Sequence, residues 1–64
     1  MPIETMQAVQ WALSQTYTDS LGYEYPVTKE DPIIVDLVRQ YFNDHDIEYN
    51  TFSYGDLTPF LEQV

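Results

Sequence analysis

The chain of 64 residues has no cysteine, only two glycines and only two basic residues, Lys29 and Arg39. Without cysteine, neither a disulfide framework nor a thiolate metal site stabilises so small a domain. No apolar run approaches the roughly 18 residues that a transmembrane helix needs, and the two isolated glycines form no phosphate-binding loop. The N-terminus lacks the basic start of a signal peptide, so we expect a cytoplasmic protein.

Negative charge dominates the composition. Eleven carboxylates face the two cations, and the formal net charge is −9. A negative potential therefore covers most of the surface, which disfavours direct binding to nucleic acid or to an anionic membrane. Basic proteins are the natural partners of such a surface, whereas the alternative is that the acids serve only solubility.

The core material is sufficient for one folded domain that spans residues 1–64. Apolar residues make up 44% of the chain, with one Trp, three Phe and six Tyr. This content argues against intrinsic disorder despite the charge.

The spacing of apolar residues predicts a first helix over residues 2–17. Pro2 suits its first turn, and the following residues recur at three- and four-residue intervals on one face: Ile3, Met6, Val9, Leu13 and Tyr17. A longer helix that runs to Leu21 and ends at Gly22 is the alternative.

A second helix is predicted from Asp31 as N-cap and Pro32 at the first helical position. Its apolar residues are Ile33, Ile34, Val35, Leu37, Val38, Tyr41 and Phe42. They cover so wide a face that this helix should be central and make contacts on two sides.

A short third helix follows, which begins either at a capping box of Ser53 and Asp56 or at Thr58-Pro59. Residues 23–27 and 47–52 alternate like extended chain and are predicted to pair as a short two-stranded β ribbon. The expected fold class is therefore mostly α: a small three-helix domain with such a ribbon.

Alternating acids after the second helix are candidate partner-binding residues. In extended chain, the side chains of Asp44, Asp46 and Glu48 would share one face about 6.6 Å apart, which is comparable to the spacing of phosphates along one nucleic-acid strand. A second acidic group begins the helix: Glu30, Asp31 and Asp36. The competing interpretation is a helix end followed by a solvated loop.

The same region contains no metal or catalytic motif. Counted from Asp44, a calcium loop requires Gly at its sixth position and Glu at its twelfth, where this chain has Tyr49 and Gly55. His45 is the only histidine, and no Ser or Cys accompanies it in a nucleophile-and-base arrangement. We therefore expect no metal, no cofactor and no enzyme activity.

Aromatic residues offer another type of contact. Trp11 falls on the side of the first helix opposite its apolar face, so it is either a partner-binding anchor or packs under residues 22–28 or 47–52. Tyr49 is a second aromatic candidate, at the edge of the acidic segment.

The leading functional hypothesis is a non-enzymatic acidic inhibitor that mimics nucleic-acid charge and blocks a basic, nucleic-acid-binding host protein. In composition it resembles the small acidic inhibitors encoded by bacteriophages and mobile elements. The alternatives are a protein-interaction module that binds through an apolar or aromatic surface, including a homodimer through the second helix, and an accessory subunit of a larger assembly.

Overall fold

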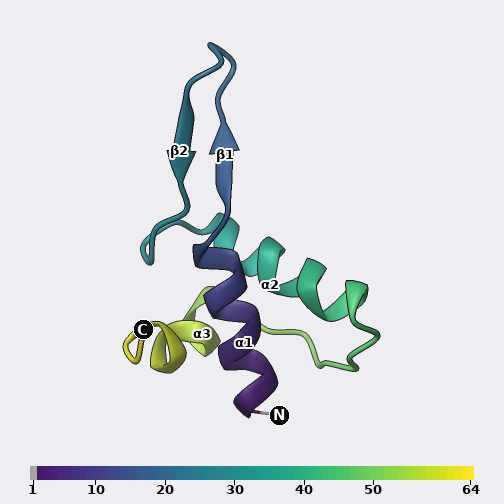
Figure 1. The fold of residues 1–64 in the computed structure, drawn as a ribbon. Coiled ribbons are helices and arrows are strands. Elements are labelled where there is room, and N and C mark those ends of the chain that lie inside the picture. Colours follow the sequence, from purple (N-terminus) through teal and green to yellow (C-terminus); the bar gives the residue numbers. More distant parts are fainter. Residues whose placement is uncertain (1) are drawn as a thin grey trace.

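The computed structural model describes residues 2–64 and consists of three helices and a two-stranded antiparallel ribbon (Figure 1). The elements in chain order are α1 (Pro2–Leu13), β1 (Thr16–Thr18), β2 (Glu24–Pro26), α2 (Ile33–Asp44) and α3 (Tyr54–Leu61). The predicted fold class, mostly α with a short ribbon, is confirmed.

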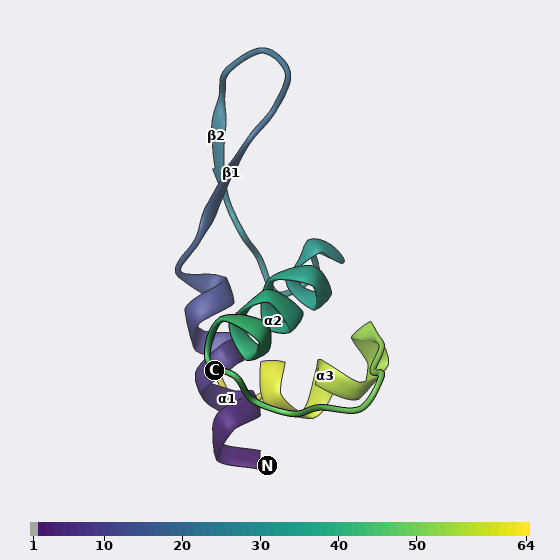
Figure 2. The same cartoon turned by 90° about the vertical axis from the view of Figure 1, so that its right-hand side faces the viewer.

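The helices form one body, from which the ribbon projects. Helix α1 runs from the base of the ribbon to the opposite end of the molecule, and α2 crosses it (Figure 1). Turning the molecule by 90° shows α3 beside this pair and the ribbon standing clear of all three helices (Figure 2). The principal extents of 37 × 25 × 17 Å reflect this elongated shape.

A small apolar core joins the three helices. Its buried members are Ala8, Val9, Ala12, Val27, Ile34, Val38, Phe42, Leu57 and Leu61. The α2 members recur every four residues, so they form one stripe along that helix. Val27 is the core residue that follows the ribbon, and its N–H donates to the Gln15 carbonyl at 3.1 Å.

Helix α1 ends at Leu13, four residues before its predicted end. Ser14 N–H donates to the Trp11 carbonyl at 3.0 Å and Gln15 N–H to the Ala12 carbonyl at 3.1 Å, which closes the last turn. Thr16–Thr18 then forms β1, because threonine and tyrosine favour the extended backbone.

The buried face of α1 also differs from the predicted stripe. Val9 is fully buried, but Ile3 is 67% exposed and Tyr17 has left the helix. Ala8 and Ala12, each fully buried, take the inner positions instead. Both alanines belong to the core through which α1 contacts α2 and α3.

The ribbon pairs residues 24–26, as predicted, but with Thr16–Thr18 in place of residues 47–52. Tyr17 lies opposite Tyr25 in the antiparallel register. The connection is short and includes Gly22 at φ +89°, a left-handed conformation that glycine adopts without steric cost. Pairing of these two neighbouring strands closes a shorter loop than pairing with residues 47–52 would, so it costs less conformational entropy.

Helix α2 begins at Ile33, and its N-cap is Pro32. The N-cap therefore lies one residue later than the predicted Asp31. Asp31 still stabilises this end, since its Oδ1 accepts the Ile33 N–H at 3.1 Å. Every apolar side chain of α2 is buried or half-buried, in agreement with the broad apolar face.

Helix α3 begins with the predicted capping box. Ser53 N–H donates to Asp56 Oδ2 at 2.9 Å, whereas the alternative start at Thr58-Pro59 is wrong because both residues lie inside the helix. The segment that precedes α3, residues 47–52, has no regular secondary structure.

A candidate acidic and aromatic binding surface

The predicted partner-binding residues lie in three separate places. Glu30, Asp31 and Asp36 lie at the start of α2, Asp44, Asp46, Glu48 and Tyr49 at and beyond its end, and Trp11 on α1. A helix of 12 residues is about 18 Å long, so the two acidic groups are far apart. We call the residues Asp44, Asp46 and Glu48 the C-terminal acids, and the residues Glu30, Asp31 and Asp36 the N-terminal acids.

Two of the N-terminal acids are engaged within the fold. Asp31 accepts the Ile33 N–H, and Asp36 forms an ion pair with Arg39 at 3.1 Å. The positive end of the α2 dipole also stabilises carboxylates here. Asp31 in addition lies near the Tyr17 hydroxyl, where partial desolvation and the Asp31 carboxylate together raise the pKa of Tyr17.

The C-terminal acids have no such compensation. All three are exposed, and within residues 2–64 the Asp36–Arg39 contact is the only ion pair. The negative end of the α2 dipole adds to their charge. Lys29 does not offset them, because its ammonium group donates to the main-chain oxygen of Val64. The negative potential should therefore be strongest at this end of α2.

The regular spacing predicted for the C-terminal acids is wrong. Asp44 is the last residue of α2, and Asp46 has φ +54°, the left-handed conformation. The helix end is closed by His45 N–H and Ile47 N–H, which donate to the carbonyls of Tyr41 and Phe42. The three carboxylates therefore surround a helix end and do not line one face of an extended strand.

His45 is held by the same helix end. Its Nδ1 lies 2.9 Å from the Tyr41 carbonyl oxygen, and its ring stacks on the Tyr41 ring with centroids 4.0 Å apart. No group of three or more His, Asp or Glu side chains in the described part of the chain is placed to hold a metal ion.

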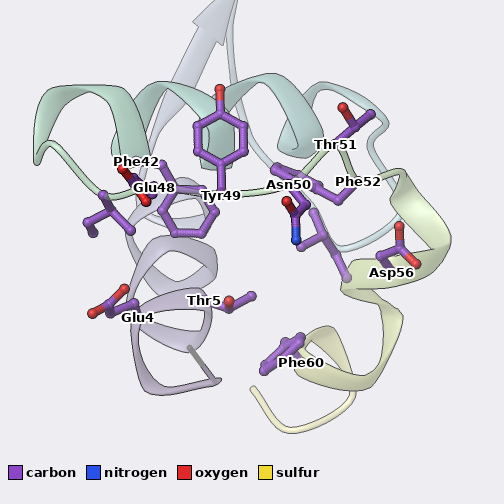
Figure 3. A pocket seen from close by; sticks show the side chains of 12 residues that line it. Glu4, Thr5, Phe42, Glu48, Tyr49, Asn50, Thr51, Phe52, Asp56 and Phe60 are labelled. Atoms are coloured by element: carbon purple, nitrogen blue, oxygen red, sulfur yellow. The ribbon is translucent and has the colours of Figure 1, made fainter.

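A groove of about 420 Å³ opens beside the C-terminal acids, between α1, the segment 47–52 and α3 (Figure 3). Its lining residues are Glu4, Thr5, Phe42, Ile47, Glu48, Tyr49, Asn50, Thr51, Phe52, Asp56, Leu57 and Phe60. A more open hollow of about 540 Å³ borders Ile47, Glu48, Tyr49 and Asn50. This segment is thus accessible along much of its length.

The groove combines an apolar floor with an acidic rim. Phe42 and Leu57 are buried at its floor, and Phe52 and Phe60 are half-buried. Glu48 was predicted as a site residue, but Glu4, Asp56 and Phe60 were not. Sequence reasoning missed these three because they belong to helices about 50 residues apart in the chain, and no local pattern reports that those helices meet.

The aromatic candidates have different environments. Tyr49 packs beside Phe42 and Phe52, with ring centroids 5.2 and 5.8 Å away, yet remains 36% exposed. Trp11 is half-buried against the core, and its ring is tilted on that of Tyr41 of α2 at 5.8 Å. Tyr49 is therefore the more accessible of the two.

The ribbon presents a second aromatic surface, which the sequence analysis did not identify. Its large exposed side chains are Tyr17, Leu21, Tyr23 and Tyr25. The rings of Tyr17 and Tyr25 pack together with centroids 5.6 Å apart. This surface was missed because Tyr17 was assigned to the first helix.

No protein-family model, curated protein or solved structure matches the chain. None of the helices in residues 2–64 has the length and the hydrophobicity that crossing a lipid bilayer requires. The function is therefore inferred from the geometry and charge of the surface itself.

Proposed function

We propose that the chain is a non-enzymatic binding protein that docks on the basic surface of a nucleic-acid-binding protein and takes the place of phosphates there. The observation that carries this proposal is the uncompensated group of C-terminal acids at the negative end of α2. Size and composition also fit the inhibitors that bacteriophages and mobile elements encode.

Electrostatics supports this function in two ways. The net charge of −9 attracts a basic partner over long distances and accelerates encounter. In addition, both basic side chains already have partners within the fold: Lys29 donates to Val64, and Arg39 pairs with Asp36. The lysines and arginines of a partner therefore meet little repulsion at the C-terminal acids.

Charge mimicry without regular spacing remains physically reasonable. Surfaces that bind nucleic acid carry Lys and Arg on flexible side chains, and much of their affinity comes from neutralising charge. A compact acidic body can satisfy such a surface without reproducing the phosphate repeat. The association should weaken strongly with salt, because screening beyond about 10 Å is already substantial at 0.1 M.

The test compares two variants that lose the same number of charges. One carries Asp44→Asn, Asp46→Asn and Glu48→Gln, and the matched control carries Glu24→Gln, Glu30→Gln and Glu62→Gln. All six residues are exposed, and Asn tolerates the left-handed conformation of residue 46.

Each protein is immobilised and incubated at low salt with a lysate freed of nucleic acid, and bound proteins are eluted with duplex DNA. We expect the wild type to retain nucleic-acid-binding proteins, to compete with DNA for them in a mobility-shift assay, and to lose most of this competition in the first variant only. Captured proteins that bind DNA equally well with and without the chain would contradict the proposal.

The second candidate function is a protein-interaction module that binds through the ribbon. Leu21 is 79% exposed and Tyr23 is 64% exposed at its end, and aromatic side chains are enriched among residues that dominate binding energy. Under this hypothesis, Leu21→Ser with Tyr23→Ser abolishes partner binding, the acidic variant does not, and salt has little effect.

A homodimer through α2 is less favoured by the structure than one through the ribbon. No large apolar residue of α2 is among the exposed ones in the described chain, whereas the ribbon contributes four. Sedimentation equilibrium of the wild type and of the Leu21→Ser/Tyr23→Ser variant distinguishes a ribbon dimer from a monomer.

A further inference from the structure

We infer that the groove between α1, the segment 47–52 and α3 receives an arginine side chain from an extended basic segment of the partner. This inference rests on the proposed function and names the group that the acidic surface recognises. The charge of the groove, the geometry of its aromatic rings and the backbone that borders it identify this occupant.

Charge complementarity favours a cation in this groove. Three carboxylates, those of Glu4, Glu48 and Asp56, belong to its lining, and no Lys or Arg does. The volume of about 420 Å³ lies at the small end of the range for ligand sites. Figure 3 shows the Glu4 and Glu48 side chains on one side of the opening and Asp56 on the other. A single long side chain with a charged head fits this arrangement.

The apolar floor favours arginine among cationic side chains. Phe42, Leu57 and Phe60 offer contact to an alkyl stem, and long basic side chains bury such stems while the charged head stays at a polar rim. A guanidinium group is planar, less strongly hydrated than an ammonium group, and able to stack on an aromatic ring. A lysine would gain the charge interaction but not the stacking.

The protein itself contains one example of this recognition. The Arg39 guanidinium lies 5.7 Å from the centre of the Phe52 ring and donates to Asp36 Oδ1 at 3.1 Å. Cation–π contact and a carboxylate partner are thus combined on a single guanidinium. The groove offers the same two kinds of group to an incoming guanidinium: the Phe60 ring, and the carboxylate of Glu4 or Glu48.

The backbone of the segment 47–52 explains why the occupant should be extended. Ile47 N–H is bonded to Phe42, but within residues 2–64 the backbone groups of residues 48–52 make no hydrogen bond to the rest of the chain. Glu48, Tyr49, Asn50 and Thr51 are also exposed. Such a segment can pair with an incoming extended peptide, whose backbone supplies affinity while a side-chain pocket supplies specificity.

The experiment is an NMR titration of the ¹⁵N-labelled chain with capped pentapeptides at low salt. The probes are acetyl-Gly-Gly-Arg-Gly-Gly-amide and the same peptide with Lys in place of Arg. We expect the arginine peptide to shift the amide signals of residues 47–52 and Phe60, and to bind about tenfold more tightly than the lysine peptide, as the additional stacking of the guanidinium on an aromatic ring implies.

Two charge-matched variants localise the effect. Glu4→Gln with Glu48→Gln should weaken binding of the arginine peptide about tenfold, whereas Glu24→Gln with Glu62→Gln removes the same charge outside the groove and should leave it within about twofold. Phe60→Leu should remove the preference for arginine and retain weak binding, because it removes the ring with little change in volume. Dispersed amide spectra establish that each variant is folded.

Equal weakening in the two glutamine variants, or equal affinity for both peptides, overturns the groove inference. Absence of binding by the arginine peptide also overturns it. Neither result decides the proposed function, because that is measured by competition between the whole acidic surface and DNA in the mobility-shift assay. A chain that competes with DNA but fails these peptide tests binds through diffuse charge alone.

Discussion

The helical body and the projecting ribbon are stabilised by different interactions. In the body, apolar side chains of three helices are removed from water, with Val9, Ile34 and Val38 fully buried. In the ribbon, every residue of both strands is exposed. The ribbon depends on its backbone pairing, on the Tyr17–Tyr25 contact and on hydrogen bonds to Asp19.

This contrast predicts two levels of stability in one small chain. Apolar burial contributes most of the free energy of folding, so the body should unfold as one cooperative unit. An isolated two-stranded hairpin is marginally stable at best, so the ribbon should open separately and more often than the body unfolds. Four predictions test this division.

The largest effect is expected from Ile34→Ala. Ile34 is fully buried between the helices, and truncation of such a side chain leaves a cavity and lowers the free energy of unfolding by about 2–5 kcal/mol. Urea denaturation followed by circular dichroism measures this change. Ile3→Ala is the control, because Ile3 is 67% exposed and its change should stay within about 0.5 kcal/mol.

Asp56→Ala should have a smaller effect on the same transition. The variant loses the bond from Ser53 N–H to the Asp56 carboxylate, and loss of a capping interaction lowers stability by about 1 kcal/mol. Asp56→Asn keeps an acceptor oxygen and should recover most of the loss. An alanine variant as stable as the wild type would mean that α3 does not need its cap.

Gly22→Ala should weaken the ribbon and leave the body nearly unchanged. At φ +89° an added Cβ is strained although nothing lies within 4 Å of it, and this strain is about 1–2 kcal/mol. We expect faster hydrogen exchange at Asp19 N–H, which donates to the Tyr23 carbonyl, and a change of less than about 0.5 kcal/mol in urea denaturation. A loss as large as that of Ile34→Ala would show that ribbon and body unfold together.

Acid should open the ribbon before it affects the rest of the molecule. Desolvation raises the pKa of Asp19, but hydrogen bonds from the Tyr23 backbone, the Tyr25 hydroxyl and the Leu21 backbone outweigh it and lower this pKa below 3.8. The carboxylate therefore stabilises the ribbon above the ordinary pKa, and this contribution is lost as pH falls through the lower folded value.

Hydrogen exchange of Tyr23 N–H, corrected for the intrinsic pH dependence of exchange, measures the acid effect. The range from about pH 5 to about pH 2 extends roughly one to two units on either side of the ordinary carboxyl pKa. Asp19→Asn keeps one acceptor oxygen without the titration, so its protection should not vary over that range. Protection of the wild type that is equally independent of pH would contradict this assignment.

The sequence predicted those elements whose signals are local. Helix α2 follows from Asp31, Pro32 and the apolar run after them, and α3 follows from Ser53 and Asp56 at capping-box spacing. In both places the residues that determine the structure are a few positions apart, so the backbone responds to them directly.

The end of α1, the inner face of that helix and the groove depend on contacts between residues that are far apart in the sequence. Tyr17 continues the helical spacing of α1 and also alternates as a strand residue, and only its pairing with Tyr25 decides between the two. Ala8 and Ala12 carry little hydrophobicity, so their place in the core is not visible in an apolar pattern. The groove joins Glu4 to Phe60, which only the packing of α1 against α3 brings together.

The position of Trp11 gives the molecule its own optical reporter. It is the single tryptophan, half-buried on α1 beside Tyr41 of α2 at 5.8 Å, within range for that tyrosine to transfer excitation to it. Its emission wavelength and intensity should therefore follow separation of α1 from α2. Because Trp11 lies in the body, movements of the ribbon that leave this contact intact should hardly change the emission wavelength or intensity.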